Sequence, residues 1–423
     1  MNRDAAGTSQ QEVPGPSLSQ AMRLALVAQQ LGRRQMRLQP WRYLVELVAG
    51  LAATGHEVRL FTDATADAAR VQGCITEVLP SVRGISKRSA IAQRINAFRP
   101  DAVLWAVAPT SSLHTWPPRR PGVANVAVLG TPIYTAKDAW AARPVIVTEP
   151  TALAMPILTW LLPDRLVATY LARYFDHTLV LGARTMRRLT ARGLDPARIT
   201  VVPPGRERDL APVVAQASRR DDVVEFLYAG NPLAVRGTRV LLRALALASA
   251  RAPNARLVML LREEREGLRQ ETHELRMMAQ SLGLERCVEI ISGNLSRPEF
   301  AERVRQTDVV VLPFLLVPAE SPLFVIEALG MGKPLVTTRA AGIPDVAGPA
   351  AWFVPPNDAR ELAEALVRLS TDAELRKDMA ARSASAFEHH PTWQEVIRAV
   401  ERVLLTAGEP VGRLVHDGTQ AAS

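Results

Sequence analysis

The chain has 423 residues, of which 48% are hydrophobic and 22% charged, and its formal net charge is +9. This length exceeds what one compact core usually holds, so we expect two domains in an ordinary globular protein. The positive charge comes without long basic runs interleaved with aromatic residues, which argues against a nucleic-acid partner.

Signals for targeting and compartment are scarce. No apolar run approaches the about 18 residues of a membrane-spanning helix. The two cysteines, Cys74 and Cys287, lie in different halves, which indicates a reducing compartment without structural disulfides. Residues 1–20 and 408–423 are polar and are predicted to be disordered tails, the first without the apolar segment of a signal peptide. We therefore expect a cytoplasmic protein, with contact at the inner face of a membrane left open.

Residues 21–205 alternate short apolar runs with segments of helical periodicity, which predicts a Rossmann-like domain. Helices are expected at residues 41–54 and 183–192, where apolar residues recur on one face. Buried strands are expected at residues 22–28, 57–61, 101–107, 123–129 and 177–181, with a last strand ending before Gly205.

Three features of this half need an interpretation. The apolar part of residues 151–175 is either a core helix or a surface for a membrane or a lipid-linked acceptor. His114 follows a strand and either reaches the ligand-binding edge of the sheet or caps a loop. His56 lies in a turn that ends a helix, away from the carboxyl ends of the strands, so we interpret it as structural.

Polar residues 206–222 are predicted to link this domain to a second Rossmann-like domain at residues 223–390. Asp358 is the predicted N-cap of one of its helices. A final helix within residues 391–407 is expected to cross back to the N-terminal domain. The strands of the second domain are expected at residues 223–229, 257–261, 288–291, 309–312 and 335–338.

The most specific pattern of the chain is a strand–helix–strand unit within residues 308–346. Ser321 and Pro322 predict the start of its helix, as a hydroxyl N-cap followed by proline at the first helical position. Helical spacing places Glu327 on one face with Leu323 and Ile326. A carboxylate among apolar neighbours is costly unless it is paired or meets a polar ligand.

The free backbone amides at the start of this helix, those of Leu323 and Phe324, predict an anion-binding site. A phosphate at the helix tip, with hydroxyls beside Glu327 one turn further along, would describe a nucleoside diphosphate and its ribose. The pattern therefore indicates a nucleotide site on this helix.

The segment Glu327–Val336 (E-A-L-G-M-G-K-P-L-V) resembles the nucleotide-sugar site of glycosyltransferase family 4, whose pattern is E-x7-E followed by A-M-A-x-G-x-P-V. Glu320 lies seven residues before Glu327, where the family carries its first glutamate eight residues before the second. The resemblance implies a GT-B fold, in which two Rossmann-like domains with parallel sheets face an interdomain cleft. It also implies a metal-independent, retaining transferase without a cofactor. Such an enzyme moves a sugar from a nucleotide-diphosphate donor to a glycan, lipid-linked or small-molecule acceptor.

The resemblance assigns roles to individual residues. Glu320 would position the transferred sugar, Arg236 would neutralise the leaving diphosphate, and Glu327 would bind the ribose hydroxyls. The acceptor would lie against the N-terminal domain, near the basic loop of residues 32–41. No metal-binding residues are expected, and the oligomeric state stays open. The remaining donor-binding residues would be Gly230, Asn231, Asn294, Ser321, Leu323 and Phe324.

Four features depart from the family pattern. Leu38 and Gln39 replace a Gly-Gly pair at which the backbone approaches the donor phosphates or the acceptor, so their side chains would block or reshape that contact. Gly130 replaces a histidine thought to help catalysis, and Asn231 replaces the arginine of the G-R-x4-K-G pattern. With the shortened glutamate spacing, these changes leave alternatives open. One is a catalytically weak or inactive scaffold or regulatory protein, and the other is a GT-B sugar-nucleotide epimerase.

Overall fold

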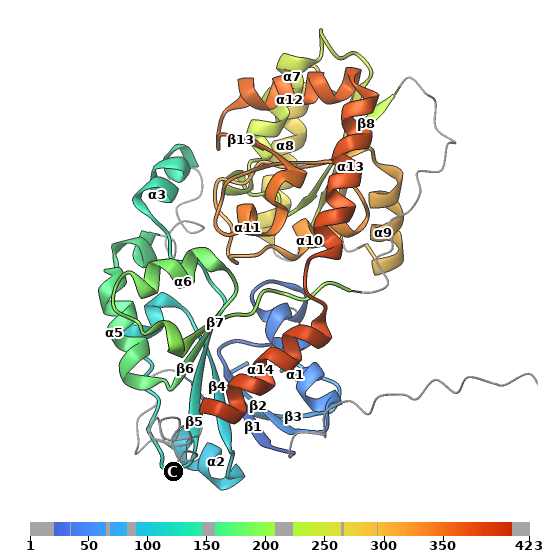
Figure 1. Ribbon diagram of the computed structural model, residues 1–423. Coiled ribbons are helices and arrows are strands. Elements are labelled where there is room, and N and C mark those ends of the chain that lie inside the picture. Colours follow the sequence, from blue (N-terminus) through green and yellow to red (C-terminus); the bar gives the residue numbers. More distant parts are fainter. Residues whose placement is uncertain are drawn as a thin grey trace, which may run out of the picture.

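The computed structural model describes residues 21–33, 35–64, 68–82, 90–145, 157–207, 223–263, 266–293 and 295–407. These residues form an N-terminal and a C-terminal α/β domain, one below the other in Figure 1. The predicted tails at residues 1–20 and 408–423, most of the predicted linker, and Asn294 lie outside the described residues. The predicted fold class, two α/β domains built on parallel sheets, is confirmed.

The N-terminal sheet is parallel throughout, and its central strands are buried because helices cover both faces. Each expected strand lies within one residue of its predicted bounds. The sequence did not predict β3, because this half-exposed edge strand contains no apolar run. The strands are β1 (Arg23–Ala28), β2 (Glu57–Thr62), β3 (Cys74–Val78), β4 (Ala102–Val107), β5 (Ala124–Leu129), β6 (His177–Val180) and β7 (Ile199–Val201), in the order β3-β2-β1-β4-β5-β6-β7. The helices are η1 (Gln35–Arg37), α1 (Trp41–Ala53), α2 (Ala90–Phe98), η2 (Pro109–Leu113), α3 (Ala136–Ala142), η3 (Arg143–Val145), α5 (Asp164–Tyr174), α6 (Ala183–Thr190) and η4 (Pro196–Arg198).

The C-terminal sheet is also parallel, and Asp358 caps a helix there as predicted, accepting from the amides of Arg360 and Glu361. Its strands are β8 (Val224–Gly230), β9 (Ala255–Leu261), β10 (Val288–Ser292), β11 (Val309–Leu312), β12 (Leu335–Thr338) and β13 (Ala351–Val354), in the order β10-β9-β8-β11-β12-β13. The helices are η5 (Ala234–Arg236), α7 (Thr238–Ala248), α8 (Glu266–Ser281), α9 (Arg297–Gln306), α10 (Leu323–Gly330), α11 (Ile343–Ala347), η6 (Gly348–Ala350), α12 (Ala359–Thr371) and α13 (Ala373–Glu388).

The last helix, α14 (Trp393–Ala407), lies on the N-terminal domain against α1 (Figure 1). Val396, Ile397 and Val400 share one buried cluster with the apolar face of α1. His56 is structural, as interpreted from the sequence. Its Nδ1 accepts the amide of Met22 at 3.1 Å, and its Nε2 lies 3.2 Å from Glu401 of α14. The C-terminal helix is therefore part of the N-terminal domain's packing.

The chain passes between the two domains twice, near Arg206 and near Pro391, and these two segments lie side by side. The amide of Arg206 donates to the carbonyl of Pro391 at 2.8 Å, and the ring of His390 lies 2.7 Å from the carbonyl of Pro204. A side chain at Gly205 would collide with the backbone of Trp393. The two chain segments thus form one joint rather than two independent linkers.

A third connection is a strap, residues Tyr134–Val145, which includes α3 and η3 and rises from the N-terminal domain toward the C-terminal one (Figure 1). Ala142 and Val145 are 2% and 7% exposed, and they belong to the core cluster of the C-terminal domain. The hydroxyl of Tyr134 donates to the carbonyl of Val317 at 2.8 Å. The assignment of residues 21–205 to the N-terminal domain does not anticipate this contact, because the short strap has no long periodic apolar face.

The apolar segment at residues 151–175 is described only from residue 157 onward. There α5 buries Val167, Tyr170 and Leu171 in the domain core, whereas Leu158 and Leu161 before it are exposed. Across the described part of the chain, no helix combines the length and the apolar character needed to cross a membrane.

Candidate functional site

The candidate site lies where the domains face each other, at the carboxyl ends of the C-terminal strands. Ligands of open α/β sheets bind at this edge, because loops and helix N-termini converge there. β8 brings Gly230 and Asn231 to this edge, and β11 leads through a loop to Glu320 and then to α10. We call this region the donor cleft after the role that the resemblance implies; Glu320, Ser321 and Leu323 are buried in it.

The start of α10 differs from the prediction for Ser321. The N-cap is Pro322, with φ −66° and ψ 124°, and no side chain caps the helix from this position. The Ser321 hydroxyl, which is buried, instead donates to the carbonyl of Leu181 in the N-terminal domain at 2.9 Å. The prediction of Ser321 as the N-cap was wrong because the buried hydroxyl needs an acceptor and finds one across the cleft.

The side chain of Gln39, from the N-terminal domain, occupies the start of α10. Its Oε1 accepts the amide of Leu323 at 3.1 Å, and its Nε2 donates to the carbonyl of Ser321 at 2.9 Å. A helix N-terminus attracts negative charge, and an amide oxygen carries a partial negative charge. Gln39 therefore satisfies the amide that the sequence predicted to bind an anion.

Glu327 lies one turn further along α10, half-buried with 17% of its side chain exposed. Its Oε1 is 2.9 Å from Nη1 of Arg42 on α1, and Nη2 of the same arginine lies 2.9 Å from Glu207. The sequence predicted that this carboxylate needs a partner, and Arg42 is that partner. Two carboxylates share one cation here, a charge-assisted arrangement stronger than neutral hydrogen bonds.

Glu320 is 1% exposed and lies against the N-terminal domain. Its Oε1 accepts the amide of Thr185 at 2.8 Å, and its Oε2 is buried without a hydrogen-bond partner in the described structure. A Cβ at Gly182 or Gly342 would come within 2.7 and 2.8 Å of Glu320 respectively. Burial raises the pKa of Glu320 to about 7, and the hydrogen bonds from Thr185 and the charge of Arg184 oppose this rise.

Gly230 ends β8 with a positive φ of 156°, which non-glycine residues rarely adopt. Asn231 follows, and its side-chain Oδ1 is buried without a partner in the described residues, while its carbonyl accepts from the Tyr228 hydroxyl at 2.7 Å. Arg236 ends η5, with its guanidinium 5.3 Å from the Phe314 ring centroid. Arg236 therefore lies beside the segment that follows β11, and its predicted contact with a diphosphate stays a prediction.

Arg236 also faces the N-terminal domain. Burial raises the pKa of Tyr134 above its usual value, and the positive charge of Arg236 opposes that rise. Phe324 differs from the other α10 residues, since its ring packs edge-on against Phe300 with centroids 5.4 Å apart. Its side chain therefore joins the core rather than the cleft. Asn294 lies outside the described residues.

Two positions at the strand ends of the N-terminal domain complete the cleft. A Cβ at Gly130 would lie 2.9 Å from Cβ of Pro40, so a larger residue does not fit while the loop before α1 lies against α10. His114 caps η2, and its Nδ1 lies 2.9 Å from the hydroxyl of Thr115. Of the two interpretations of His114, the structure supports the loop cap.

Sequence reasoning missed Arg42 and Thr185, both of which contact the predicted glutamates. Thr185 lies in the first turn of α6, whose N-cap is Gly182, and a glycine two residues after a strand was a usable signal. Arg42 carried no such signal, because its carboxylate partner lies 285 residues away in the chain.

Comparison with known proteins identifies both halves of the chain. A family model described as "Glycosyl transferase 4-like domain" matches residues 40–205, and one described as "Glycosyl transferases group 1" matches residues 223–372. The D-inositol 3-phosphate glycosyltransferase of Kribbella flavida is 27% identical over 397 residues, covering 84% of this chain and 89% of that protein. The enzyme of the same name from Corynebacterium jeikeium is 30% identical over 220 residues, covering 48% of this chain and 51% of that protein. In that match the chain spans about half the length of its relative.

Solved structures with low sequence identity share the fold. Anabaena Alr3699/HepE in complex with UDP superposes with a TM-score of 0.68 at 14% identity, covering 91% of this chain and all of that one (100%). Sucrose-phosphate synthase (tll1590) from Thermosynechococcus elongatus has a TM-score of 0.68 at 17% identity, covering 90% and 98%. Both likenesses concern the fold alone.

Proposed function

We propose that this chain, which belongs to the GT4-type glycosyltransferases and has their GT-B fold, transfers a sugar from a nucleotide-diphosphate donor to an acceptor. The observation that carries the proposal is α10, which presents the Leu323 amide and, one turn later, the Glu327 carboxylate to the cleft. An anion site followed by an acceptor of hydroxyl hydrogen bonds matches a diphosphate and its ribose.

In this proposal each residue has a distinct task. Glu327 accepts hydrogen bonds from the ribose, and the Leu323 amide binds a phosphate oxygen. Arg236 faces the diphosphate from η5, and the buried Glu320 contacts the sugar. The donor base stays open, although the likeness to a UDP complex makes a uridine donor the first to test.

Transfer would be retaining and would need no metal. The bond between the anomeric carbon and the diphosphate oxygen breaks, and the acceptor oxygen bonds to the same face of the sugar. The acceptor's hydroxyl proton leaves with the diphosphate. Arg236 and the N-terminus of α10 would stabilise the charge that develops on the diphosphate, the role a metal ion fills elsewhere.

Donor binding must displace two side chains of the N-terminal domain. The oxygen of Gln39 lies where a phosphate oxygen would meet the Leu323 amide, and the N–H groups of Arg42 lie where ribose hydroxyls would meet Glu327. Residues 39–42 thus imitate a bound donor. Opening at the paired crossings near Arg206 and Pro391 would free both positions.

For the acceptor, the class stays a sugar, a lipid-linked or a small molecule, bound against the N-terminal domain near residues 32–41. Relatives named for D-inositol 3-phosphate make a phosphorylated polyol the first candidate. The scaffold and epimerase alternatives are not favoured, because these relatives carry glycosyltransferase names.

The test is a thermal-shift panel of UDP, GDP, ADP and their sugar conjugates, repeated with Glu327→Ala. A ligand at 100 times its Kd adds about 2.7 kcal/mol to the free energy of unfolding, which a shift in Tm reveals. A selective shift that the variant loses supports the proposal and names the base. No shift with any nucleotide at millimolar concentration contradicts it and favours the scaffold alternative.

A further inference from the structure

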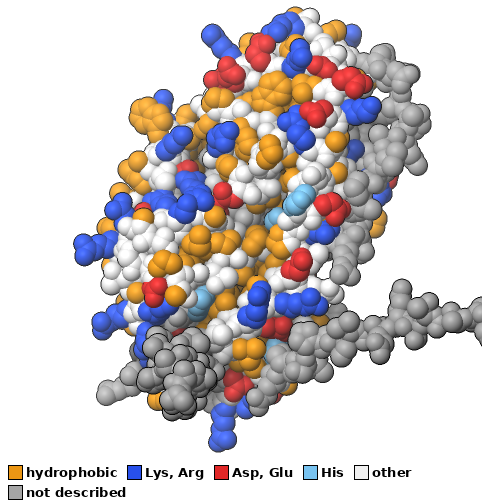
Figure 2. Space-filling view, in the orientation of Figure 1, with side chains coloured by type: hydrophobic (Ala, Val, Ile, Leu, Met, Phe, Trp, Pro, Cys, Tyr) orange, Lys and Arg blue, Asp and Glu red, His pale blue; other side chains and the backbone are white. Residues whose placement is uncertain are grey.

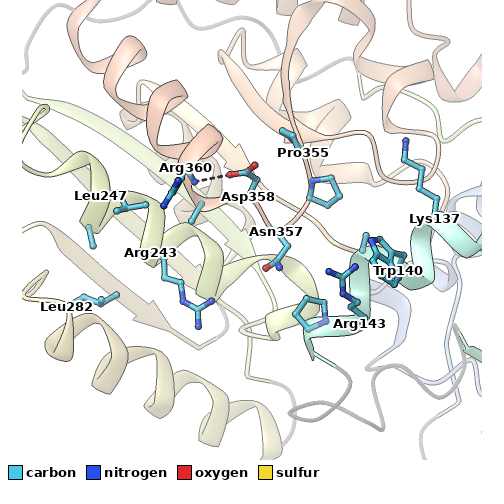
Figure 3. A pocket seen from close by; sticks show the side chains of 15 residues that line it. Lys137, Trp140, Arg143, Arg243, Leu247, Leu282, Pro355, Asn357, Asp358 and Arg360 are labelled. Carbon is cyan, nitrogen blue, oxygen red and sulfur yellow. Dashed lines mark hydrogen bonds between the residues drawn. The ribbon is translucent and has the colours of Figure 1, made fainter.

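A second hollow lies outside the donor cleft, where the strap meets the C-terminal domain (Figure 3). Its volume is about 810 Å³, within the range of roughly 300–1,000 Å³ that small-molecule sites occupy. One wall is the strap, and the other consists of α7, the end of α8 and the loop from β13 to α12. None of the donor-cleft residues named above lines it. We call it the strap pocket.

The strap wall is held in place at several points. Thr135 caps α3 and forms reciprocal hydrogen bonds with Asp138, which also pairs with Arg184 of α6 at 2.6 Å. Ala142 and Val145 anchor the far end of the strap in the C-terminal core. The pocket is therefore framed by packed elements of both domains.

The lining of the strap pocket is mostly apolar, and its charged side chains are mostly basic. The charged residues of the lining are Lys137, Arg143, Arg243, Arg360 and Asp358, a balance of four positive charges against one negative. Asp358 is already engaged, since its Oδ1 accepts two backbone amides at the start of α12. Among the ion pairs of the described residues, none involves these four cations.

Clustered cations lower the free energy of a bound anion, because their mutual repulsion is relieved when negative charge enters. Figure 2 shows Lys and Arg side chains gathered on the side of the molecule where α3 and α6 lie in Figure 1. The strap pocket lies on that side, so the surrounding surface also favours an approaching anion.

The pocket also presents an aromatic platform. Trp140 is 68% exposed, unusual for the largest apolar side chain. The guanidinium of Arg143 lies 3.5 Å from its ring centroid and holds the indole by a cation–π contact. Figure 3 shows Arg243 extending from α7 toward the side where Trp140 and Arg143 lie. Pro144, Pro355 and Pro356 complete a rigid apolar lining.

We propose that the strap pocket binds a sugar or polyol that carries a phosphate or carboxylate group. Its ring would pack on Trp140, and its anionic group would be held by Arg143 and Arg243. Because these arginines belong to the strap and to α7, the ligand would reinforce the attachment of the strap to the C-terminal domain by Ala142 and Val145 and so stabilise the closed arrangement. The inference does not depend on the transfer reaction in the donor cleft.

The experiment is calorimetric titration of the full chain at low ionic strength with glucose 6-phosphate and with glucuronate. Both probes are expected to bind, whereas glucose and inorganic phosphate each bind at least about tenfold more weakly, because each offers only one half of the contacts. Arg243→Gln and Trp140→Ala are each expected to weaken binding about tenfold. Preference for one probe identifies the anionic group.

Two controls locate the effect. Arg269→Gln removes the same charge from an exposed position of α8 outside the pocket and is expected to leave Kd unchanged. Glu327→Ala is expected to leave it unchanged as well, which separates the strap pocket from the donor cleft. Unfolding midpoints of the pocket variants should match the parent, since Trp140 and Arg243 are exposed.

Several outcomes would overturn the inference. Unchanged binding in the combined Trp140→Ala and Arg243→Gln variant removes the pocket as the site. Equal affinity for inorganic phosphate excludes the sugar class, and tighter binding of adenosine monophosphate means that an aromatic base, not a sugar ring, packs on Trp140. Loss of binding in Glu327→Ala places the ligand in the donor cleft instead.

Discussion

The donor cleft and the strap pocket are both bounded by the two domains, yet their polar groups are arranged in opposite ways. In the cleft, Glu327 meets Arg42, the Leu323 amide meets Gln39, and Glu320 meets the Thr185 amide. In the strap pocket, four positive side chains and one carboxylate, which already accepts two backbone amides, line a hollow. Complementary groups allow the domains to close on each other, whereas like charges hold a space that an anion can fill.

The difference shows that charged and polar side chains close a site when they pair with each other and leave it open when they do not. The cleft can bind a donor only by exchanging protein contacts for ligand contacts, so its net affinity is the difference between two sets of hydrogen bonds. In the strap pocket, an anion would break no ion pair of the four basic side chains, because none of them forms one among the described residues. The four predictions below test this contrast, beginning with the largest expected effect.

Glu327→Ala should lower nucleotide affinity by at least about a hundredfold, because the ribose loses a charged hydrogen-bond acceptor. Nucleotide titration of the parent and the variant measures the effect. The variant should still fold, since the side chain is half-buried and pairs with Arg42 rather than with the core. Unchanged nucleotide affinity would remove α10 as the donor helix and with it the contrast between the two regions.

Arg236→Gln should lower kcat/KM by roughly a hundredfold, the lower end of the usual cost of removing a group that stabilises transition-state charge. Arg236→Lys should restore part of the activity, because it keeps the charge and loses only the planar fork. Steady-state kinetics with the donor identified by thermal shift provide the measurement. A rise in KM with unchanged kcat would mean that Arg236 binds donor and transition state equally.

Glu320 should make stability depend on pH. Its pKa is raised from 4.5 to about 7, so the folded chain keeps a proton that the unfolded chain has released. The free energy of unfolding should therefore fall by about 3 kcal/mol between pH 4.5 and pH 7 and level off above that. Denaturant titrations of the parent and of Glu320→Gln across this range isolate the contribution. Parallel pH profiles for the two proteins would contradict it.

Gln39→Gly should strengthen nucleotide binding about tenfold, because the donor no longer displaces two hydrogen bonds at α10. Leu38→Gly is the matched control, since it adds the same backbone freedom one residue away and leaves Gln39 in place. Titration calorimetry with the nucleotide selected in the panel measures both. Weaker binding in Gln39→Gly would show that this side chain helps to hold the donor.

Most of the fold could be predicted from the chain itself. The runs Val309–Leu312 and Leu335–Thr338 coincide with β11 and β12, because a strand buried on both faces is mostly apolar. The two buried threonines of β12 donate their hydroxyls to backbone carbonyls. The edge strand β3 and the short helix α3 were not predicted, because half-exposed or short elements need no long apolar run. The need of Glu327 for a partner could also be predicted from the sequence, because helical spacing alone places it on an apolar helix face.

What the sequence determined by itself was the alternation of elements, the position of α10 and the presence of a carboxylate on its buried face. Tertiary structure decided the partners: Arg42 for Glu327, Gln39 for the Leu323 amide, and a strap that frames a basic pocket. The physical reason is range. Periodicity and capping act over one or two helical turns, whereas hydrogen bonds and ion pairs join atoms regardless of separation in the chain, and only the folded arrangement of both domains brings them together.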